Sequence, residues 1–225
     1  MSLIQAHFSD SDRQRVNQAI REAEGMTAAE IVPVIARSSG RYDRAEDMVG
    51  LWFAAFAIGC VWMLYPTPSH DASHWGTPSA TWQLVALLAA GGMGFLVGAI
   101  LGTRIDGLRR LFTPKAQMSD EVQLRARSLF FDQRVHHTAG QTGIVLYLSM
   151  YERTAAIIAD QRIVDALGQQ HLDLRCQELT QRLKVASLID ALCETTKQLG
   201  IDLSKSLPRS SDDINELPDA LVLID

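Results

Sequence analysis

The most informative pattern along the chain is an apolar stretch between two densely charged regions. Residues 48–103 contain a single charged side chain, Asp71. The stretch divides into two runs, residues 48–65 and 80–102, which contain 18 and 23 residues. As helices, both runs are long enough to cross the roughly 30 Å hydrocarbon core of a bilayer. A short turn rich in Pro, Ser and Thr joins them, so the pattern predicts a helical hairpin whose partner is the lipid bilayer.

A pair of buried core helices is the alternative interpretation of these two runs. A helix that is apolar on all sides is either buried in the core of a large protein or placed in a membrane. Only about 170 residues remain outside the hairpin, enough for one soluble domain with a modest core. A domain of that size seldom hides two such helices, so we favour the membrane.

Basic residues predict how the hairpin is oriented. Lys and Arg near the ends of membrane spans mark the cytoplasmic side. They gather at the outer ends of both runs: Arg37, Arg41, Arg44, Arg104, Arg109, Arg110 and Lys115. The turn between the runs contains neither Lys nor Arg. We therefore expect a multi-pass membrane protein with both termini in the cytoplasm and the turn on the far side.

The regions on either side of the hairpin have the pattern of strands. Residues 30–36 form a β-rich run, and residues 142–151 form a nearly continuous apolar run that predicts a central strand. Residues 154–160 follow after a tight turn, which predicts a β-hairpin. Because Pro33 has no N–H group, the first run is expected to be an edge strand or a bulged one.

Helical patterns surround these strands. The first begins at Ser9, where Ser9 and Asp12 resemble a capping box, and the others cover residues 118–131, 172–183 and 187–199. The predicted fold class is α/β, a small mixed sheet of three to four strands covered by helices and interrupted by the two-helix transmembrane hairpin. The expected organisation is an N-terminal part of the domain, the hairpin, a C-terminal part and an acidic tail: residues 1–44, 45–110, 111–202 and 203–225.

Charge and cysteine content narrow the choice of function. A net charge of −5 argues against nucleic acid as a partner. The three cysteines, Cys60, Cys176 and Cys193, lack the C-x-x-C spacing of redox and zinc motifs. In a reducing cytoplasm they are expected to be buried thiols.

Three stretches outside the hairpin resemble the TPM domain family. The first, residues 7–36, is a helix that leads into a Glu-Ile-Val strand, and the second, residues 142–163, contains a Thr-Gly-apolar strand, a Glu-Arg turn and a strand ending in Ala-Asp. The third, residues 215–225, is similar to the ending of bacterial members that carry a membrane hairpin. Secreted members have a Gly-rich turn after the second strand of the β-hairpin, whereas this chain has no glycine there before Gly168.

The resemblance implies two functions. Some members are auxiliary proteins of membrane complexes, which implies an interaction or maintenance module at the membrane with a membrane-protein partner. Others are described as weak acid phosphatases or as calcium-binding proteins. The alternative is therefore a weak metal-dependent phosphomonoester hydrolase that uses a divalent cation, Ca²⁺ or Mg²⁺.

Asp160 is the candidate residue for catalysis or metal binding. It ends a predicted strand, where ligand sites of α/β proteins are often found. A carboxylate there can hold a divalent cation or act as a nucleophile, and the alternative is a turn carboxylate that caps the segment from Ile163 onward. Glu152 and Arg153 are candidates for anion binding, with a solvated hairpin turn as the alternative.

Other polar clusters are expected to be structural. The acidic run of Asp212, Asp213, Glu216 and Asp219 lacks the spacing of an EF-hand and predicts a solvated tail. His70 and His74 stand four residues apart, but three prolines around them disfavour the helix that a shared metal would need. Adjacent histidines such as His136 and His137 point in different directions and rarely share a metal.

Glycines in the second apolar run predict close helix packing. Gly94, Gly98 and Gly102 recur every four residues, and such a small-residue face lets another helix approach closely. The partner is expected to be the first apolar run, with Ala55 and Gly59 as the matching face, or a second copy of the chain. We favour the first, because a hairpin keeps its two helices at high effective concentration.

Overall fold

The computed structural model describes residues 8–64, 80–210 and 215–225. It consists of two compact units. The sheet unit comprises Met1–Gly40 and Ala116–Asp225, and the hairpin unit comprises Arg41–Lys115. The loop with His70 and His74, where no shared metal is expected, lies outside the described residues, as do Asp212 and Asp213.

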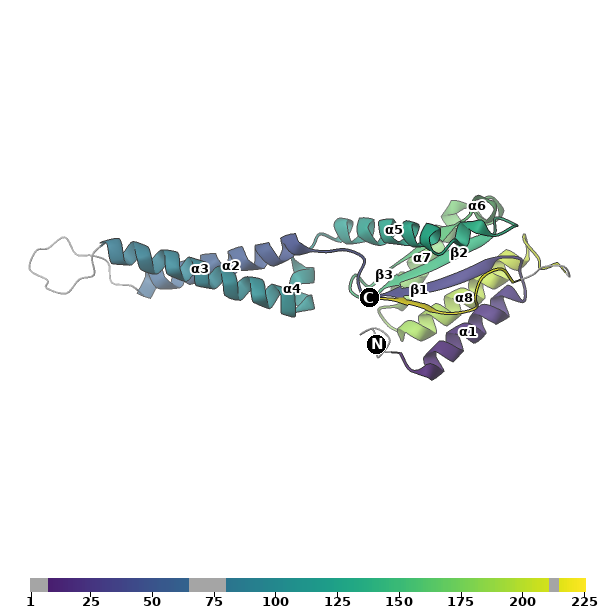
Figure 1. The fold of residues 1–225 in the computed structure, drawn as a ribbon, viewed down its shortest axis with the longest axis horizontal. Helices are drawn as coiled ribbons and strands as arrows, with labels where there is room; N and C mark the ends of the chain where they lie inside the picture. Colours follow the sequence, from purple (N-terminus) through teal and green to yellow (C-terminus); the bar gives the residue numbers. More distant parts are fainter. Residues whose placement is uncertain (1–7, 65–79, 211–214) are drawn as a thin grey trace, which may run out of the picture. The chain divides into compact units, whose positions relative to one another are not determined.

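A four-stranded mixed sheet forms the centre of the sheet unit (Figure 1). Its strands are β1 (Glu30–Ala36), β2 (Gly143–Ser149), β3 (Thr154–Ala159) and β4 (Val222–Ile224), in the order β3-β2-β1-β4. β1 is parallel to β2 and β4, and β2 is antiparallel to β3. Ile31 lies opposite Ile144, so the prediction that the strands before and after the hairpin share one sheet is confirmed.

The prediction that Pro33 marks an edge strand is wrong, because β1 lies between β2 and β4. The backbone pattern explains how the proline is tolerated. Glu30 donates its N–H toward β2, to Thr142, and Arg37 donates its N–H toward β4, to Ile224. N–H groups alternate along a strand, so position 33 faces β4, whose pairing begins only at Val34. The missing donor therefore removes no ladder hydrogen bond.

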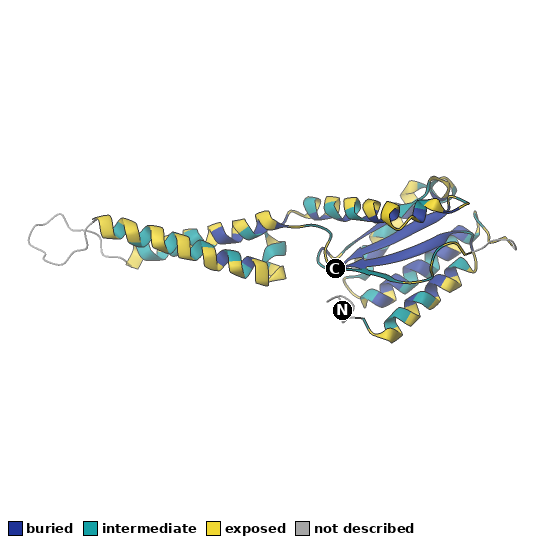
Figure 2. Cartoon of the chain, viewed as in Figure 1, coloured by how far each residue is buried: buried dark blue, intermediate teal, exposed yellow. Residues whose placement is uncertain are grey.

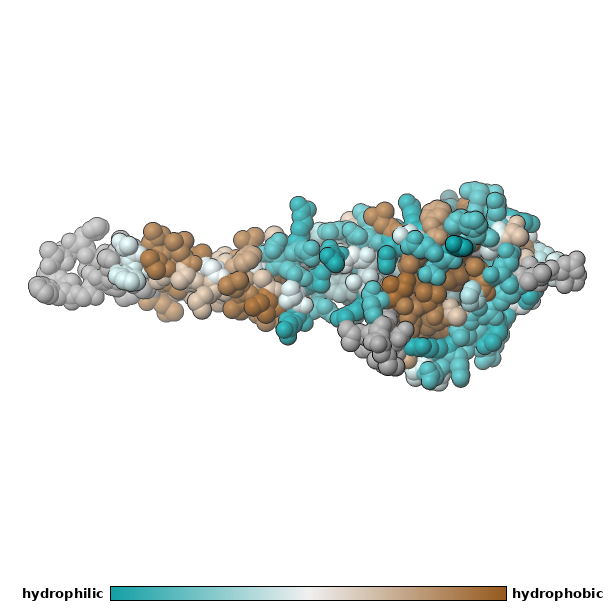
Figure 3. Space-filling model, viewed as in Figure 1, coloured by the Kyte–Doolittle hydropathy of each residue, from teal (hydrophilic) through white to brown (hydrophobic). Residues whose placement is uncertain are grey.

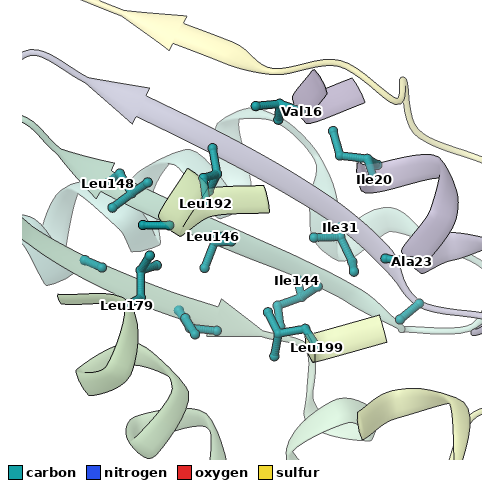
Figure 4. Close-up of a cluster of buried hydrophobic side chains, with 14 of the residues drawn as sticks. Val16, Ile20, Ala23, Ile31, Ile144, Leu146, Leu148, Leu179, Leu192 and Leu199 are labelled. Atoms are coloured by element: carbon teal, nitrogen blue, oxygen red, sulfur yellow. The ribbon is translucent and has the colours of Figure 1, made fainter. Parts of the chain in front are cut away.

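Helices cover both faces of the sheet. Strand residues alternate between the faces. Ile31, Ile144 and Leu146 face α1 (Asp10–Glu24), α7 (Gln169–Arg182) and α8 (Leu188–Ser204) (Figure 4). Val34 and Tyr147 belong to the other cluster, under α5 (Lys115–Asp132). The predicted fold class, a small mixed sheet covered by helices and interrupted by two apolar helices, is confirmed.

The hairpin unit contains two long apolar helices and one short helix. α2 (Asp43–Leu64) and α3 (Ala80–Arg104) pack along each other, and α4 (Asp106–Leu111) follows α3. The surfaces of α2 and α3 are mostly exposed (Figure 2) and apolar (Figure 3). The sequence predicted no helix at α4.

The last residues are part of the sheet rather than a separate acidic tail. Val222–Ile224 pair with β1, and the N–H of Leu221 donates to Asn17 of α1. The segment before β4 is held by two further contacts. Glu30 accepts hydrogen bonds from the N–H groups of Glu216 and Leu217, at 3.1 and 3.4 Å. Backbone pairing and a buried carboxylate therefore fix a segment that its composition suggested was solvated.

Candidate functional site

A charged pocket of about 310 Å³ lies where α1 ends and β1 begins. Three carboxylates and two guanidinium groups contribute to its lining: Glu24, Glu30, Asp219, Arg21 and Arg209. They come from α1, from the first residue of β1 and from the segments before and after residues 211–214. Residues 21–30, Arg209 and residues 215–219, which are distant in the sequence, thus meet at one edge of the sheet unit.

Glu24 is a carboxylate of this pocket with strongly altered acidity. It is half-buried and accepts a hydrogen bond from the N–H of Ile31 at 2.9 Å. Burial raises the pKa of Glu24 to about 8, and the nearby carboxylates of Glu30 and Asp219 also raise it, against the effect of the Ile31 hydrogen bond. Such a carboxylate takes up or releases a proton near neutral pH.

Carboxylates also hold the neighbouring segments together. Glu30 is 6% exposed and binds the backbone before β4, as described above. Glu216 accepts the N–H of Ala139 with both carboxylate oxygens, at 2.9 and 3.1 Å. The side chain of Asn215 donates to Asp219. No local pattern indicates this site, because the contacts of Glu30 and Glu216 join residues 77 to 187 positions apart.

Asp160 occupies the N-cap position of α6 (Gln161–Leu167), but its side chain does not cap that helix. It accepts a hydrogen bond from the N–H of Gly143 at 2.9 Å and so holds the start of β2. The interpretation of Asp160 as a capping carboxylate is therefore wrong. Burial raises the pKa of Asp160, while the Gly143 hydrogen bond and the charge of His136 act in the opposite direction.

In the described part of the chain, Asp160 belongs to no group of three or more side chains that could hold a metal ion. Within residues 8–64, 80–210 and 215–225, no group of three or more His, Cys, Asp or Glu side chains is arranged to hold a metal ion. His136 packs against Phe131 and His137, with ring centroids 5.0 and 4.5 Å away. A cation or phosphatase site at Asp160 stays a prediction.

The alternative interpretation of the turn between β2 and β3 was a solvated turn. The structure shows that one of its two charged residues is buried. Glu152 is 2% exposed, accepts the N–H of Ser39 at 2.8 Å and also accepts the hydroxyl of Ser149. Its carboxylate thereby connects the turn to the chain that leaves β1. Arg153 is exposed and has a left-handed backbone conformation, with φ at 49°. The two residues therefore lie in different environments.

The glycine face of α3 lies against α2. A Cβ atom added at Gly94 would be 2.7 Å from the carbonyl oxygen of Phe53, and one at Gly98 would be 2.7 Å from the Phe53 Cβ. At Gly102 the nearest atom is the Glu46 Cα, at 3.3 Å. The expected matching face is wrong, because a Cβ at Gly59 would meet nothing within 4 Å. Four other α2 residues lie within reach of the face: Val49, Gly50, Ala54 and Ala57.

Comparisons with known proteins give a fold but no function. No protein-family model matches the chain, and no curated protein matches it. The chain is similar to the BA42 protein from the psychrophilic bacterium Bizionia argentinensis, which is known from an NMR structure. The match covers 99% of each chain with a TM-score of 0.57 and 17% sequence identity. At that identity the likeness shows the fold alone: an α/β protein with a mixed sheet covered by helices.

Proposed function

We propose that this chain is an integral protein of the bacterial inner membrane and that α2 and α3 anchor it there. One observation supports the proposal most directly: in the most apolar 18-residue stretch of each helix, only 11% of α2 and 6% of α3 is buried. A core helix of a soluble protein is mostly buried, whereas a lipid-facing helix has its apolar surface exposed in the absence of lipid. The exposed side chains include Phe56, Met63, Leu88 and Met93.

The sheet unit then serves as a TPM-like interaction or maintenance module on the cytoplasmic side. The three stretches that resemble TPM domains support this part of the proposal, because together they contribute all four strands. Residues 7–36 contain β1, residues 142–163 contain β2 and β3, and residues 215–225 contain β4. Val34 of β1 and Val222 of β4, which are 188 positions apart in the sequence, thus pair in one sheet, as a shared domain requires.

Thiol labelling in intact cells tests the anchor and its orientation. Single cysteines would be introduced as Ser73→Cys and Ser210→Cys, in a chain without the three native cysteines. An impermeant thiol reagent is expected to label Ser73→Cys in intact cells and Ser210→Cys only after lysis. The reverse result would show that the orientation is wrong. Recovery of the chain in the supernatant after an alkaline carbonate wash would contradict the membrane anchor itself.

Co-purification in mild detergent tests the role of the sheet unit. The full chain is expected to retain a membrane-protein partner, and residues 41–115 alone are expected to lose it. Equal recovery by the hairpin alone would contradict a module role for the sheet unit. Mg²⁺- or Ca²⁺-dependent hydrolysis of a phosphomonoester that disappears in Asp160→Asn would favour the phosphatase function instead.

A further inference from the structure

The short helix α4 has a fixed position at the end of the apolar helix pair. α3 ends at Arg104, and Ile105 adopts an extended conformation with φ −112° and ψ 94° while its N–H still donates to Leu101 at 2.9 Å. The chain therefore turns sharply at Ile105. α4 then lies across the end of the pair and contacts both α2 and α3 (Figure 1).

Arg109 holds α4 against the beginning of α2. Its Nε lies 3.3 Å from a carboxylate oxygen of Glu46, and both side chains are 20% exposed. Its guanidinium carbon lies 5.7 Å from the ring centroid of Tyr42, which is buried. The hydroxyl of Thr113 donates to the Arg109 carbonyl at 2.9 Å, just after the helix ends. These contacts set which side chains of α4 point outward.

The exposed side chains of α4 and of the neighbouring helix ends are apolar and charged, and the basic ones outnumber the acidic Asp43, Asp47 and Asp106. Two of them are large apolar side chains: Ile105 is 47% exposed and Leu111 is 77% exposed. Exposed basic side chains stand just before α2, in its first turn, at the end of α3 and after α4: Arg41, Arg44, Arg104 and Lys115. The exposed apolar surface of α3 continues up to Ile100, so the basic side chains begin where the apolar band ends.

We propose that α4 lies in the headgroup layer of the membrane and binds anionic phospholipids. Leu111 and Ile105 enter the boundary of the acyl chains, while the basic side chains contact lipid phosphates. This inference rests on the proposed membrane anchor. A helix that crosses the end of a membrane-spanning pair lies in the plane of the interface, where a mixed apolar and basic surface is stable.

Charge complementarity identifies the partner as an anionic lipid surface. Residues 41–47 and 104–115 contain six basic and four acidic side chains, a net charge of +2. The whole chain carries −5, so all other residues together carry −7. A basic side chain near an anionic membrane strengthens binding by about fivefold. Two such side chains should therefore contribute at least about tenfold after screening by salt.

Lipid retention by the full chain in mild detergent tests the basic side chains. Native mass spectrometry should show preferential retention of phosphatidylglycerol over phosphatidylcholine. The double variant Arg44→Gln/Arg104→Gln should lower that preference by about tenfold. The control Lys184→Gln/Lys205→Gln removes two exposed charges from the sheet unit and should leave the preference unchanged. An unchanged preference in Arg44→Gln/Arg104→Gln would overturn the proposal and leave the basic surface to a protein partner.

A depth measurement tests the apolar side chains independently of those variants. Spin labels would be placed at Leu111→Cys and, as a matched exposed leucine of the sheet unit, at Leu174→Cys. In anionic vesicles, the label at 111 should collide more with oxygen than with a polar nickel reagent, and the label at 174 should do the opposite. If the chain withstands a carbonate wash but both labels are equally aqueous, this inference fails while the membrane anchor stands. Loss of the chain from the vesicles would refute the anchor.

Discussion

Replacing Glu24 by glutamine should stabilise the sheet unit above neutral pH. In the folded chain, the carboxylate accepts the N–H of Ile31 and shares its pocket with Glu30 and Asp219. Burial and these two neighbours raise its pKa to about 8. A glutamine amide keeps an oxygen that accepts the Ile31 hydrogen bond, but it never carries a charge. The substitution thus imitates the protonated form of Glu24 at every pH.

The direction of the pH effect follows from the two pKa values. Unfolding returns the pKa of Glu24 from about 8 to its ordinary value of 4.5, so the folded state binds the proton more tightly. The contribution of Glu24 to the free energy of unfolding is fully present below pH 4.5 and is lost as the pH rises to about 8. The full shift corresponds to an upper limit of roughly 5 kcal/mol. Because water can enter the pocket when the carboxylate ionises, we expect about 2 kcal/mol.

Hydrogen exchange of β1 and β2 peptides measures this effect in the full chain in mild detergent. The free energy of opening in the unmodified chain should fall by about 2 kcal/mol between roughly pH 5.5 and roughly pH 8.5, after correction for intrinsic exchange. Glu24→Gln should abolish that fall. Glu22→Gln is the matched control, because Glu22 is exposed on the same helix and pairs with Lys197. An equal fall in Glu24→Gln and the unmodified chain would refute a protonated Glu24.

Three further predictions concern packing, folding and an ion-pair network. Gly98→Ala should lower the thermal stability of the helix pair in detergent more than Gly92→Ala, because only the Gly98 methyl group would overlap α2. A Gly/Ser linker in place of residues 41–115 should leave a sheet unit with a cooperative melt. Asp202→Asn should cost about 2 kcal/mol in denaturant unfolding at neutral pH, because it leaves Arg175 without its main carboxylate partner, and the difference should shrink in acid.

The acid dependence of the last prediction follows from the environment of Asp202. Its burial alone would raise the pKa, but hydrogen bonds and charge from His171 and Arg175 lower it below its ordinary value. Those contacts measure 2.8 Å each. A lowered pKa gives stability that is present above the unfolded value of 3.8 and is lost as the pH falls through the folded value. A difference that persisted in strong acid would contradict this account.

Apolar periodicity was sufficient to predict most of the architecture. The strands at β1, β2 and β3 and the long helices are local patterns, and burying the faces of the strands requires them to share one sheet. The exceptions have physical causes. β4 is only three residues long, too short for a periodic signal, and it is held by pairing with β1. α4 is six residues long and depends on the ion pair between Arg109 and Glu46 rather than on its own pattern.

The charged pocket could not be predicted from local sequence, because its side chains come from segments that are far apart along the chain and meet only in the folded structure. A glutamate at the end of α1 is ordinary in sequence, and its altered acidity comes first from burial and then from the carboxylates of Glu30 and of Asp219, the latter nearly two hundred residues later. Likewise, Glu152 stands in a tight turn that suggests solvent exposure, yet it binds the N–H of Ser39, 113 positions earlier. In both cases a carboxylate satisfies backbone donors at the junction between elements. Since buried N–H groups require acceptors, acidic residues at such junctions become structural once the sheet brings the segments together.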